Sequence, residues 1–483
     1  MTIDAARRTS HSVSSARQRV MAPLMSACVV LVVAMVAAVN LAIPKLAASD
    51  LAPSATQVVW IVDTYVLVFG CLLIPAGAVG DRLGRKGVLL AGLGVFAAGC
   101  LLAAAAPSVP VLLAGRLVTG VGAALTMPAT LSLLLQVTAP QDTPRAIAAW
   151  TAATGIAGAV GNLAGGAVLQ WLPWRGLFLC ALPVAGILAA LVARFAPRGQ
   201  RHPAALDLAG AALLTAALFA LLFGIIEGPE HGWSSASVLG AFGCAAVLLA
   251  VFAVYAARAS HPLLDPRLFA IPRLRSGALG VSAAFFGLFA LFFVNAQYLQ
   301  YAKGYSPLKT GVAIAPVVVG MLVVSKRSVG LAQRFGARPV VGAGLLVLGG
   351  GLGLLSLLDA DTPYLLYAVF LLVLSVGMGL CVPLLSVGIM GALPPDRAGL
   401  GAGLNSAARE IGSALGVAVM GTVLTGRLDG GGTGAGALAG GDPAARARAV
   451  ETFTDAMAAG FGVVAVVVAV VGLLAAAGFR DRN

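Results

Sequence analysis

Some ionisable side chains lie inside long apolar stretches of the chain, where charge is costly to bury. Those that could carry chemistry are Asp63, Arg116, Arg409 and Glu410. A carboxylate in such a setting is a candidate for exchanging a proton or for attracting a cation, so Asp63 and Glu410 are the candidate proton sites. A buried guanidinium needs carbonyl or carboxylate partners, which makes Arg116 a candidate centre of a polar network.

The stretches that hold these residues have the length of membrane-spanning helices. Hydrophobic residues make up 60% of the 483 residues and charged residues only 10%, and the mean hydropathy is +0.98. Apolar runs of about 20 residues recur from end to end, and this length crosses a hydrocarbon core ~30 Å thick. Short alternating segments, as in a β-barrel, are not seen. We therefore predict an all-α polytopic membrane protein.

Fourteen transmembrane helices are predicted. Their boundaries are roughly 25–46, 58–80, 87–105, 109–135, 147–169, 176–195, 208–227, 236–257, 278–299, 311–331, 338–358, 364–384, 402–425 and 455–478. With the N-terminus in the cytoplasm, most of the 31 Lys and Arg residues fall in cytoplasmic segments, as the positive-inside rule requires. We therefore predict a multi-pass protein of the inner (plasma) membrane with both termini in the cytoplasm.

The same ionisable residues also have structural interpretations in a membrane. Asp63 would be a carboxylate in water at the membrane surface, and Arg116 would be a hub of structural hydrogen bonds. Arg409 and Glu410 would lie at the interface, with their side chains reaching the polar region. Neighbours on a helix point in different directions, so these two residues need not pair with each other.

Other kinds of chemistry find little support in the sequence. The six cysteines stand singly in apolar stretches and the four histidines do not cluster, so neither a disulfide framework nor a metal site is predicted. The stretch 401–407 lacks the Gly-Lys-Ser/Thr ending of an ATP-binding loop. The net charge of +13 comes largely from Lys and Arg residues in the segments predicted to face the cytoplasm, so we predict no nucleic-acid partner. No loop contains a cluster of Asp or His residues or a residue spacing typical of metal ligands, so we predict no cofactor and no enzymatic activity.

The stretch GAVGDRLGRKGVL at 77–89 places four charges between two apolar segments. The chain must turn tightly in so short a loop, and glycine permits both the turn and the close approach of helices. Asp81 can pair with a cation or cap a helix N-terminus, and a turn held in the cytoplasm by its positive charge is the simpler alternative. The residues of interest in this stretch are Gly77, Gly80, Asp81, Arg82, Gly84, Arg85 and Lys86.

A weak copy of this stretch, VGLAQRFGARPVV, lies 252 residues later at 329–341, with Gly336 in the position of Gly84. Parallel repeats of six-helix halves are one transporter architecture, and six plus six leaves two helices over. We predict a cytoplasmic tail at 1–21, six-helix bundles at 22–200 and 261–483, an inserted helix pair at 201–260, and a flexible outer loop at 426–452.

The sequence resembles the major facilitator superfamily, and within it the fourteen-span drug:proton antiporters that export drugs and antibiotics. GAVGDRLGRKGVL resembles the cytoplasmic signature of the superfamily, and LAGRLVTGVGAA around Arg116 resembles the span-4 motif of proton-coupled exporters. Further similar stretches, in the expected order, are WIVDTYVL, GNLAGG, YLQYAKGYSPLKTG and NSAAREIGSALGVAV. The resemblance implies the major facilitator fold, with two six-helix bundles plus two inserted helices.

The resemblance also implies roles for particular residues. Asp81 would contact the neighbouring half as part of a cytoplasmic gate when the transporter faces outward, with Arg82 and Arg85 supporting it. Arg116 would act in proton coupling through its effect on the pKa of a nearby carboxylate. The antiporter motif would comprise Gly161, Asn162, Gly165 and Gly166.

Aromatic side chains in the second and ninth spans offer surface that suits lipophilic or cationic compounds. The candidate pocket residues are Asn40, Trp60, Tyr65, Phe289, Phe293, Tyr298 and Arg409. The alternative for each aromatic residue is packing or contact with lipid. Lys326 and Arg327 lie near the cytoplasmic end of the tenth span, where they reach the polar surface or bind an anionic group.

Two departures from the family pattern affect these expectations. Met35 and Ala37 stand where the family has an acidic residue and a threonine in the first span, and Asn162 replaces a proline in the fifth. Without the first-span acid, Asp63 and Glu410 are the leading candidates for carrying the proton. A preference for cations is no longer implied, and the sequence is equally compatible with neutral or anionic substrates.

The function predicted is proton-coupled efflux of lipophilic small molecules, such as drugs or antibiotics, by alternating access. The alternatives are a narrow-specificity exporter of a neutral or anionic metabolite and a non-coupled facilitator. The predicted partners are the small-molecule substrate, protons and the lipid bilayer, and the protein is expected to be a monomer.

Overall fold

The fold is helical throughout the ranges that the structure, a computed structural model, describes. These ranges are 2–47, 49–53, 55–197, 207–260, 262–394, 397–428 and 443–479. Within them, fourteen helices are long and apolar enough to cross a membrane. The prediction of an all-α protein with fourteen spans is therefore confirmed. The predicted outer loop at 426–452 is wrong at both ends, because residues 426–428 and 443–452 are helical, and its middle, 429–442, lies outside the described residues.

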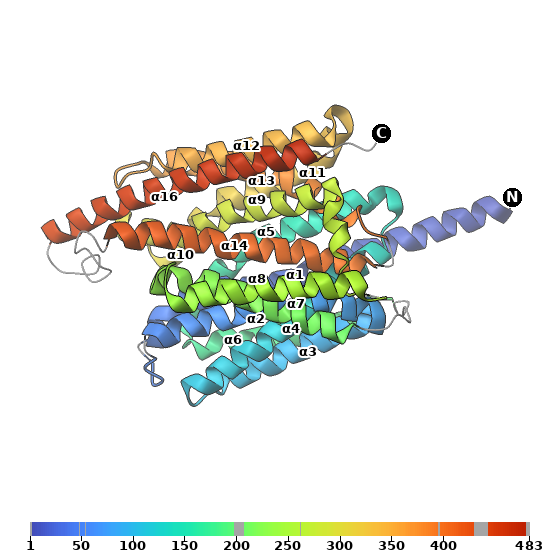
Figure 1. Cartoon of the computed structure of the whole chain (residues 1–483), viewed down its shortest axis with the longest axis horizontal. Coiled ribbons are helices and arrows are strands. Elements are labelled where there is room, and N and C mark those ends of the chain that lie inside the picture. The colour runs from blue at the N-terminus through green and yellow to red at the C-terminus, as the bar shows by residue number, and fades with distance from the viewer. Residues whose placement is uncertain are drawn as a thin grey trace. The chain divides into compact units, whose positions relative to one another are not determined.

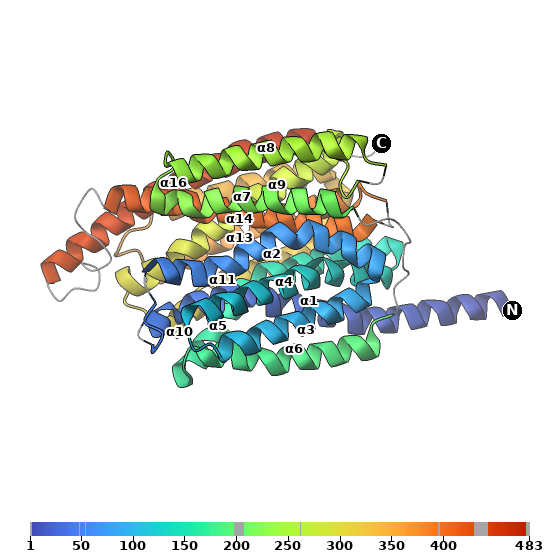
Figure 2. The ribbon, with the colours of Figure 1, turned by 60° about the horizontal axis from the view of Figure 1, so that its bottom comes forward.

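The helices follow one another along the chain (Figures 1 and 2). The first six spans are α1 (Thr2–Ala47), α2 (Ala55–Leu83), α3 (Arg85–Ala104), α4 (Val109–Gln136), α5 (Thr143–Trp171) and α6 (Arg175–Phe195). The next two are α7 (Leu208–His231) and α8 (Ala236–Arg258). The last six are α9 (Pro272–Gln297), α10 (Pro307–Ala313) with α11 (Ala315–Phe335), α12 (Ala337–Leu355), α13 (Tyr364–Met390), α14 (Ala398–Leu428) and α16 (Pro443–Gly478).

The tenth span differs from its prediction as one continuous helix, because it is divided at Ile314 into α10 and α11. Pro316 lies in the first turn of α11, where its missing N–H and fixed φ suit a helix start. The two pieces still form one candidate span, Leu308–Phe335.

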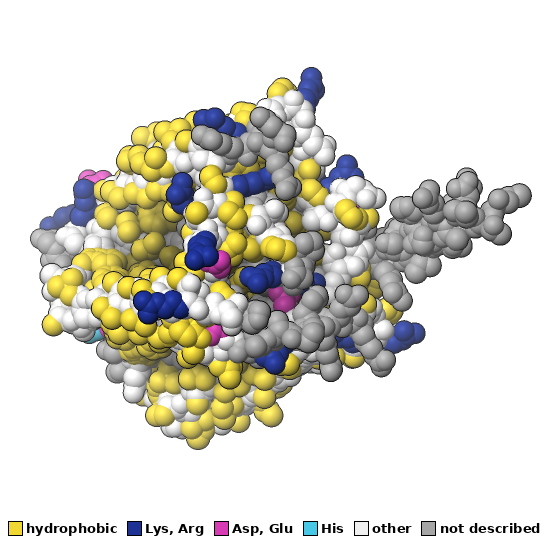
Figure 3. All heavy atoms as spheres, turned by 45° about the vertical axis from the view of Figure 1, so that its right-hand side comes forward, with side chains coloured by type: hydrophobic (Ala, Val, Ile, Leu, Met, Phe, Trp, Pro, Cys, Tyr) yellow, Lys and Arg dark blue, Asp and Glu magenta, His cyan; other side chains and the backbone are white. Residues whose placement is uncertain are grey.

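The surface has the character expected of a membrane protein. Large apolar side chains are exposed on many helices, among them Leu191, Val247, Val319 and Leu474. Figure 3 shows hydrophobic side chains over much of the visible surface, with Lys and Arg side chains between them. Exposed apolar surface of this extent marks contact with a membrane or a partner, and the helix lengths identify the bilayer.

The chain divides into two compact units. The first comprises Met1–Thr215, Phe252–Pro266 and Ile389–Ala407, and the second comprises Ala216–Val251, Arg267–Gly388 and Ala408–Asn483. The inserted pair α7 and α8 contributes to both units, and so does α14. The bundle boundaries drawn from the sequence stay a prediction.

A single glycine makes the turn in each of the two repeated stretches. Gly84, with φ of 102°, is the only residue between α2 and α3, and Gly336, with φ of 90°, is the only residue between α11 and α12. Such a φ is accessible to glycine and strained for other residues. The prediction that glycine permits the turn is confirmed, and the sequence repeat corresponds to a repeat in structure.

Replacing Gly84 or Gly336 by alanine is expected to lower stability by about 1–3 kcal/mol, the range for a residue held in a sparsely populated backbone region. Thermal melting of the purified protein in detergent measures the effect. Gly87→Ala is the matched control, because Gly87 is helical and a Cβ there meets nothing within 4 Å. An equal loss in the control would show that the backbone conformation is not the cause.

Closely spaced glycines bring α5 against α1 in the first unit. A Cβ on Gly161 would collide with the carbonyl oxygen of Ala34, and one on Gly165 would lie 2.9 Å from the Cβ of Ala38. The two glycines are four residues apart and so lie on one face of α5. Helix α5 continues unbroken through Asn162, as expected when the proline is missing.

The second unit repeats this contact between α14 and α9. A Cβ on Gly412 would collide with the carbonyl oxygen of Ser282, and one on Gly416 with that of Phe286. Sequence reasoning overlooked this pair, although its spacing within NSAAREIGSALG carries the same small-residue signal. Each unit therefore holds one helix against another through a glycine pair.

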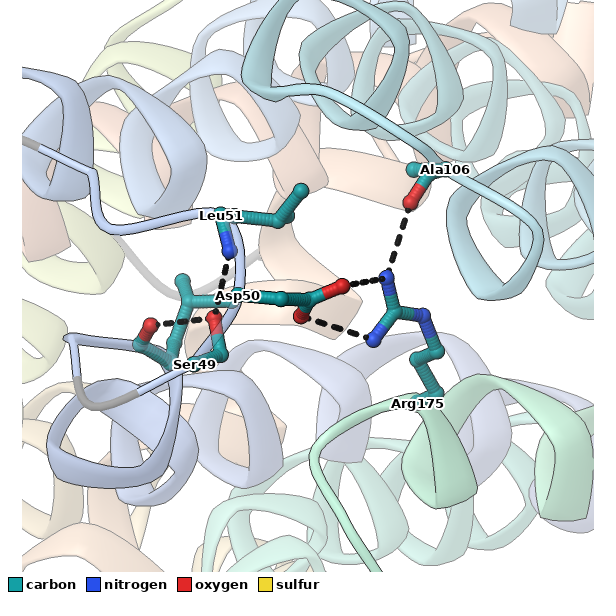
Figure 4. Close-up of polar contacts among 6 residues, drawn as sticks. Ser49, Asp50, Leu51, Ala106 and Arg175 are labelled. Atoms are coloured by element: carbon teal, nitrogen blue, oxygen red, sulfur yellow. Dashed lines mark hydrogen bonds and ion pairs between the residues drawn. The ribbon is translucent and has the colours of Figure 1, made fainter.

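Arg175, the first residue of α6, ties together three connections at one end of the first unit (Figure 4). Its guanidinium donates two hydrogen bonds of 3.1 Å to the carboxylate of Asp50 and one of 3.0 Å to the carbonyl oxygen of Ala106. The hydroxyl of Ser49 donates to the carbonyl oxygen of Leu46 at 2.6 Å. These bonds join the α1–α2 loop, the α3–α4 turn and the start of α6.

The tie is expected to weaken in acid. The hydrogen bond from Arg175 lowers the pKa of Asp50 below its usual range. A lowered pKa in the folded protein gives stability that is present above the unfolded pKa of ~3.9 and is lost as pH falls through the folded value. Asp50→Asn should therefore lower the melting temperature slightly at pH 7 and not at all in strong acid, and the effect is small because the pair is exposed. A difference that persists unchanged in acid would contradict the ion-pair explanation.

Candidate functional site

Arg116 on α4 is fully buried inside a span and binds the backbone of α2. Its Nε donates to the carbonyl oxygen of Ile61 at 2.8 Å, and its Nη2 to that of Val62 at 3.2 Å. The guanidinium lies 4.5 Å from the centroid of the Tyr65 ring, in cation–π contact. The Tyr65 hydroxyl in turn donates to the carbonyl oxygen of Val32 on α1 at 2.7 Å. Arg116 thus centres a network that links α1, α2 and α4.

One donor of Arg116 remains unused in the described part of the chain, because buried Nη1 has no hydrogen-bond partner there. A buried unsatisfied donor costs about 1–3 kcal/mol, and more when it is charged. An acceptor such as a carboxylate or a ligand oxygen would satisfy this nitrogen. Asp63 follows the two bonded carbonyl groups directly on α2 and is half-buried.

Arg409 and Glu410 form a buried ion pair on α14. Arg409 is 3% exposed and Glu410 is 8% exposed. The glutamate Oε1 accepts from Nη2 of Arg409 at 2.6 Å and from Nε at 3.0 Å, and the guanidinium lies 5.7 Å from the centroid of Phe285 on α9. Sequence reasoning did not require this contact, since neighbouring side chains diverge. The long arginine side chain folds back onto its neighbour instead of extending to the membrane surface.

The two buried sites belong to different units. Arg116 and Asp63 lie in the first unit, and the Arg409–Glu410 pair lies in the second. Near the pair, the Ser282 hydroxyl donates to the carbonyl oxygen of Ala408 at 2.7 Å, which fixes α14 against α9. Each site is therefore held by its own set of helices.

Asp81 joins three helix ends in the first unit. Its Oδ1 accepts from Nε of Arg85 at 3.0 Å, and its Oδ2 accepts from the backbone N–H of Leu400, in the first turn of α14, at 3.2 Å. The first N–H groups of a helix lack intrahelical partners and attract negative charge. Arg85 is buried and also donates to the carbonyl oxygen of Ser132 on α4 at 3.3 Å. Both alternatives expected for Asp81, pairing with a cation and capping a helix, are confirmed.

Among the remaining residues of this stretch, Lys86 holds the end of another helix. Lys86 donates to the carbonyl oxygens of Ala193 and Ala196, at 2.8 and 2.9 Å, and so caps the C-terminal end of α6. Arg82 is half-buried in the last turn of α2, and Gly77 and Gly80 are buried earlier on that helix. Through Asp81, Arg85 and Lys86 the stretch contacts α4, α6 and α14, and its role as a cytoplasmic gate stays a prediction.

The candidate pocket residues divide into two kinds. Tyr65 and Tyr298 are buried with their hydroxyl groups engaged, since the Tyr298 hydroxyl donates to the carbonyl oxygen of Asp359 at 2.9 Å. The others have accessible surface: Asn40 and Phe293 are exposed, and Trp60 and Phe289 are half-buried. They lie on α1, α2 and α9 and so belong to both units. Among the described residues, no three His, Cys, Asp or Glu side chains are placed to hold a metal ion.

Lys303 and Asp359 build a polar cap next to Tyr298 that sequence reasoning missed. Lys303 donates to the carbonyl oxygens of Ala360 and Thr362, and burial lowers its pKa. The hydrogen bond from the Thr362 hydroxyl lowers the pKa of Asp359. The turn itself is local, since Asp359 Oδ1 accepts from the N–H groups of Asp361 and Thr362, as Asp residues often do in turns. The contacts from Lys303 and Tyr298 are tertiary and have no signal in the local sequence.

Comparison with known proteins assigns the chain to a family. Residues 25–417 match the sequence pattern described as Major Facilitator Superfamily. The chain is 34% identical over 371 residues to the methylenomycin A resistance protein of Streptomyces coelicolor, covering 76% of this chain and 78% of that protein. It is 36% identical over 397 residues to the puromycin resistance protein pur8 of Streptomyces alboniger, covering 80% and 78%. It is 31% identical over 382 residues to the multidrug efflux pump LfrA of Mycolicibacterium smegmatis, covering 79% and 76%.

Solved structures show the same fold at lower sequence identity. The human organic anion transporter MFSD10 superposes with a TM-score of 0.67 at 18% identity, covering 95% of this chain and 99% of that one. A bacterial homologue of the lysosomal transporter Spinster superposes with a TM-score of 0.63 at 17% identity, covering 96% and 97%. The chain therefore belongs to the major facilitator superfamily, and within it to the multi-pass membrane transporters related to drug and antibiotic efflux proteins.

Proposed function

We propose that this protein exports lipophilic small molecules, such as drugs or antibiotics, in exchange for protons by alternating access. The observation that carries the proposal is the fully buried Arg116, which holds two α2 carbonyl groups and keeps one guanidinium nitrogen for a further acceptor. Ionisable groups inside spans are costly and mark substrate or proton pathways. The relatives named for resistance and efflux support export as the direction of transport.

Glu410 is the proton site with the clearest mechanism. When it is ionised, it neutralises Arg409 beside it. Protonation removes the negative charge and leaves the buried guanidinium with a weaker partner, which favours a change of conformation or the binding of another acceptor. Asp63, next to the carbonyl groups that hold Arg116, is the second proton site. Protons moving inward through these groups would drive the substrate outward.

Asp81 supplies the conformational gate in this proposal. Its bond to the N–H of Leu400 holds the start of α14 to the α2–α3 turn. Opening on that side of the membrane requires this bond to break. The contact therefore stabilises one conformation and not the other.

Asp81→Asn is expected to reduce transport several-fold without loss of folded protein. Asparagine keeps the size and one carbonyl acceptor but removes the charge that pairs with Arg85 and favours the α14 terminus. Asp142→Asn is the control. Asp142 directly precedes α5 and pairs with Arg145 in the first turn of that helix, at the longer distance of 3.8 Å and with more exposed side chains. Equal transport by both variants would remove Asp81 from the gate.

The test of coupling uses purified protein in liposomes with an imposed pH gradient. Proton movement is followed as cationic, neutral and anionic lipophilic compounds are added, for the wild type, Asp63→Asn and Glu410→Gln. Substrate-triggered proton movement that one variant loses would establish antiport and identify the coupling carboxylate. Transport without proton movement would favour the alternative, a facilitator, and movement with a single compound would favour a narrow exporter.

A further inference from the structure

Helix α11 carries a basic pair, Lys326 and Arg327, inside the span Leu308–Phe335. Both side chains are exposed, and within the described residues neither makes a hydrogen bond or an ion pair. Unpaired charge within a span is costly unless it reaches water or an opposite charge. This pair therefore needs a partner from outside the described chain.

The pair belongs to a continuous exposed stripe of α11. Toward the middle of the span the exposed residues are apolar, namely Val319, Leu322 and Val323. Toward the end at Phe335 they are Gly330, Gln333 and Arg334. Spacings of three and four residues place all of these on one side of the helix. The stripe is thus apolar along one part and basic along the other.

The opposite side of α11 packs against α13. A Cβ on Gly320 would collide with the side chain of Ser375, and one on Gly379 would lie 2.9 Å from the Cβ of Val324. Ser325 and Ser328 on this side are buried. At the basic stripe, in contrast, a Cβ on Gly330 would meet nothing within 4 Å. There is therefore open space between the basic pair and Arg334.

The first copy of the internal repeat lacks these charges. Ile74 and Pro75 on α2 lie 252 residues before Lys326 and Arg327, the spacing of the two repeated stretches. Ile74 is only 4% exposed, because α14 covers it: a Cβ on Gly403 would lie 3.0 Å from the Cα of Ile74. The first repeat has an apolar, covered face where the second has a basic, open one.

The pair lies within the hydrocarbon depth of the span, and its long side chains can extend toward the polar boundary of the leaflet. The span is 28 residues long, or about 42 Å, which exceeds a hydrocarbon core of ~30 Å. Lys326 lies nine residues, or about 13 Å, before the helix end. Long basic side chains at this depth extend to the polar boundary while their methylene groups stay in the apolar layer.

We propose that this stripe binds an anionic phospholipid, with its phosphate between Lys326, Arg327 and Arg334 and its acyl chains along Val319, Leu322 and Val323. The charge complementarity and the adjacent apolar surface favour a lipid over a free anion. Bound lipid would neutralise the basic stripe and stabilise α11 in the second unit. The stripe lies on α11, whereas the proposed proton sites lie on α2 and α14.

Native mass spectrometry of the full-length protein in neutral detergent tests the site, by titration with phosphatidylglycerol and with phosphatidylcholine. Each basic residue near an anionic headgroup contributes roughly a factor of five in affinity, so Lys326→Gln with Arg327→Gln should weaken phosphatidylglycerol binding about 30-fold. The matched control is Arg145→Gln with Arg258→Gln, which removes two exposed cations elsewhere and should leave binding unchanged. Thermal melting without lipid confirms that each double variant is folded.

Three results would overturn the proposal. The first is undiminished phosphatidylglycerol binding by the Lys326/Arg327 variant, and the second is equal affinity of the wild type for phosphatidylcholine. The third is loss of transport of anionic compounds with lipid binding intact, which would assign the pair to a substrate. Failure of the wild type to exchange protons in liposomes would bear on the proposed function and not on this site.

Discussion

Arg116→Lys is expected to reduce transport about 10- to 100-fold while leaving most of the protein folded. Lysine keeps the charge but cannot reproduce the planar arrangement that reaches the Ile61 and Val62 carbonyl groups and contacts the Tyr65 ring. A lysine can still reach one of the two carbonyl groups, and the loss of one hydrogen bond to a charged group, roughly 1.5–3 kcal/mol, corresponds to this loss in rate. Efflux from proteoliposomes measures the effect.

Arg116→Met separates a structural role from a functional one. Methionine fills similar volume without charge, and replacing a buried charge by a well-packed apolar side chain need not lower stability. We expect transport to be lost and the melting temperature to change little. The control is Arg145→Lys, at an exposed position on the same unit. Full transport by the methionine variant would show that Arg116 is only a structural hub.

The second large effect is expected at the Arg409–Glu410 pair. Glu410→Ala should lower stability by about 3–5 kcal/mol, because removing one member of a buried ion pair leaves the other charge uncompensated. Replacing both, as Arg409→Met with Glu410→Leu, should restore most of that stability, since no charge remains buried. Thermal melting in detergent follows both changes.

The double variant decides what the pair does. If Glu410 carries protons, the double variant is stable and shows no substrate-driven proton movement in liposomes. If it moves protons like the wild type, the pair is structural and Asp63 is the site to examine. Ser413→Ala is a matched control on α14, because it removes only a hydrogen bond to the Arg409 carbonyl oxygen.

The sequence by itself determined the architecture and the family. The fourteen spans follow from hydropathy, because a bilayer of fixed thickness demands apolar helices of a minimum length and internally satisfied backbones. The turn at Gly84 and its repeat at Gly336 follow from glycine's access to positive φ. The family motifs around Asp81 and Arg116 are also local, because each lies within a short stretch of sequence.

Only the tertiary structure decided how the functional groups are paired. The bond between Asp81 and Leu400 joins residues 319 positions apart, and the Arg409–Glu410 pair is buried where α9 packs against α14. Likewise, Ile74 is covered by α14, whereas Lys326, at the equivalent position of the second repeat, is exposed. The physical reason is that hydropathy and backbone preference act over a few residues. The partners of a charge are set instead by which distant helices meet around it.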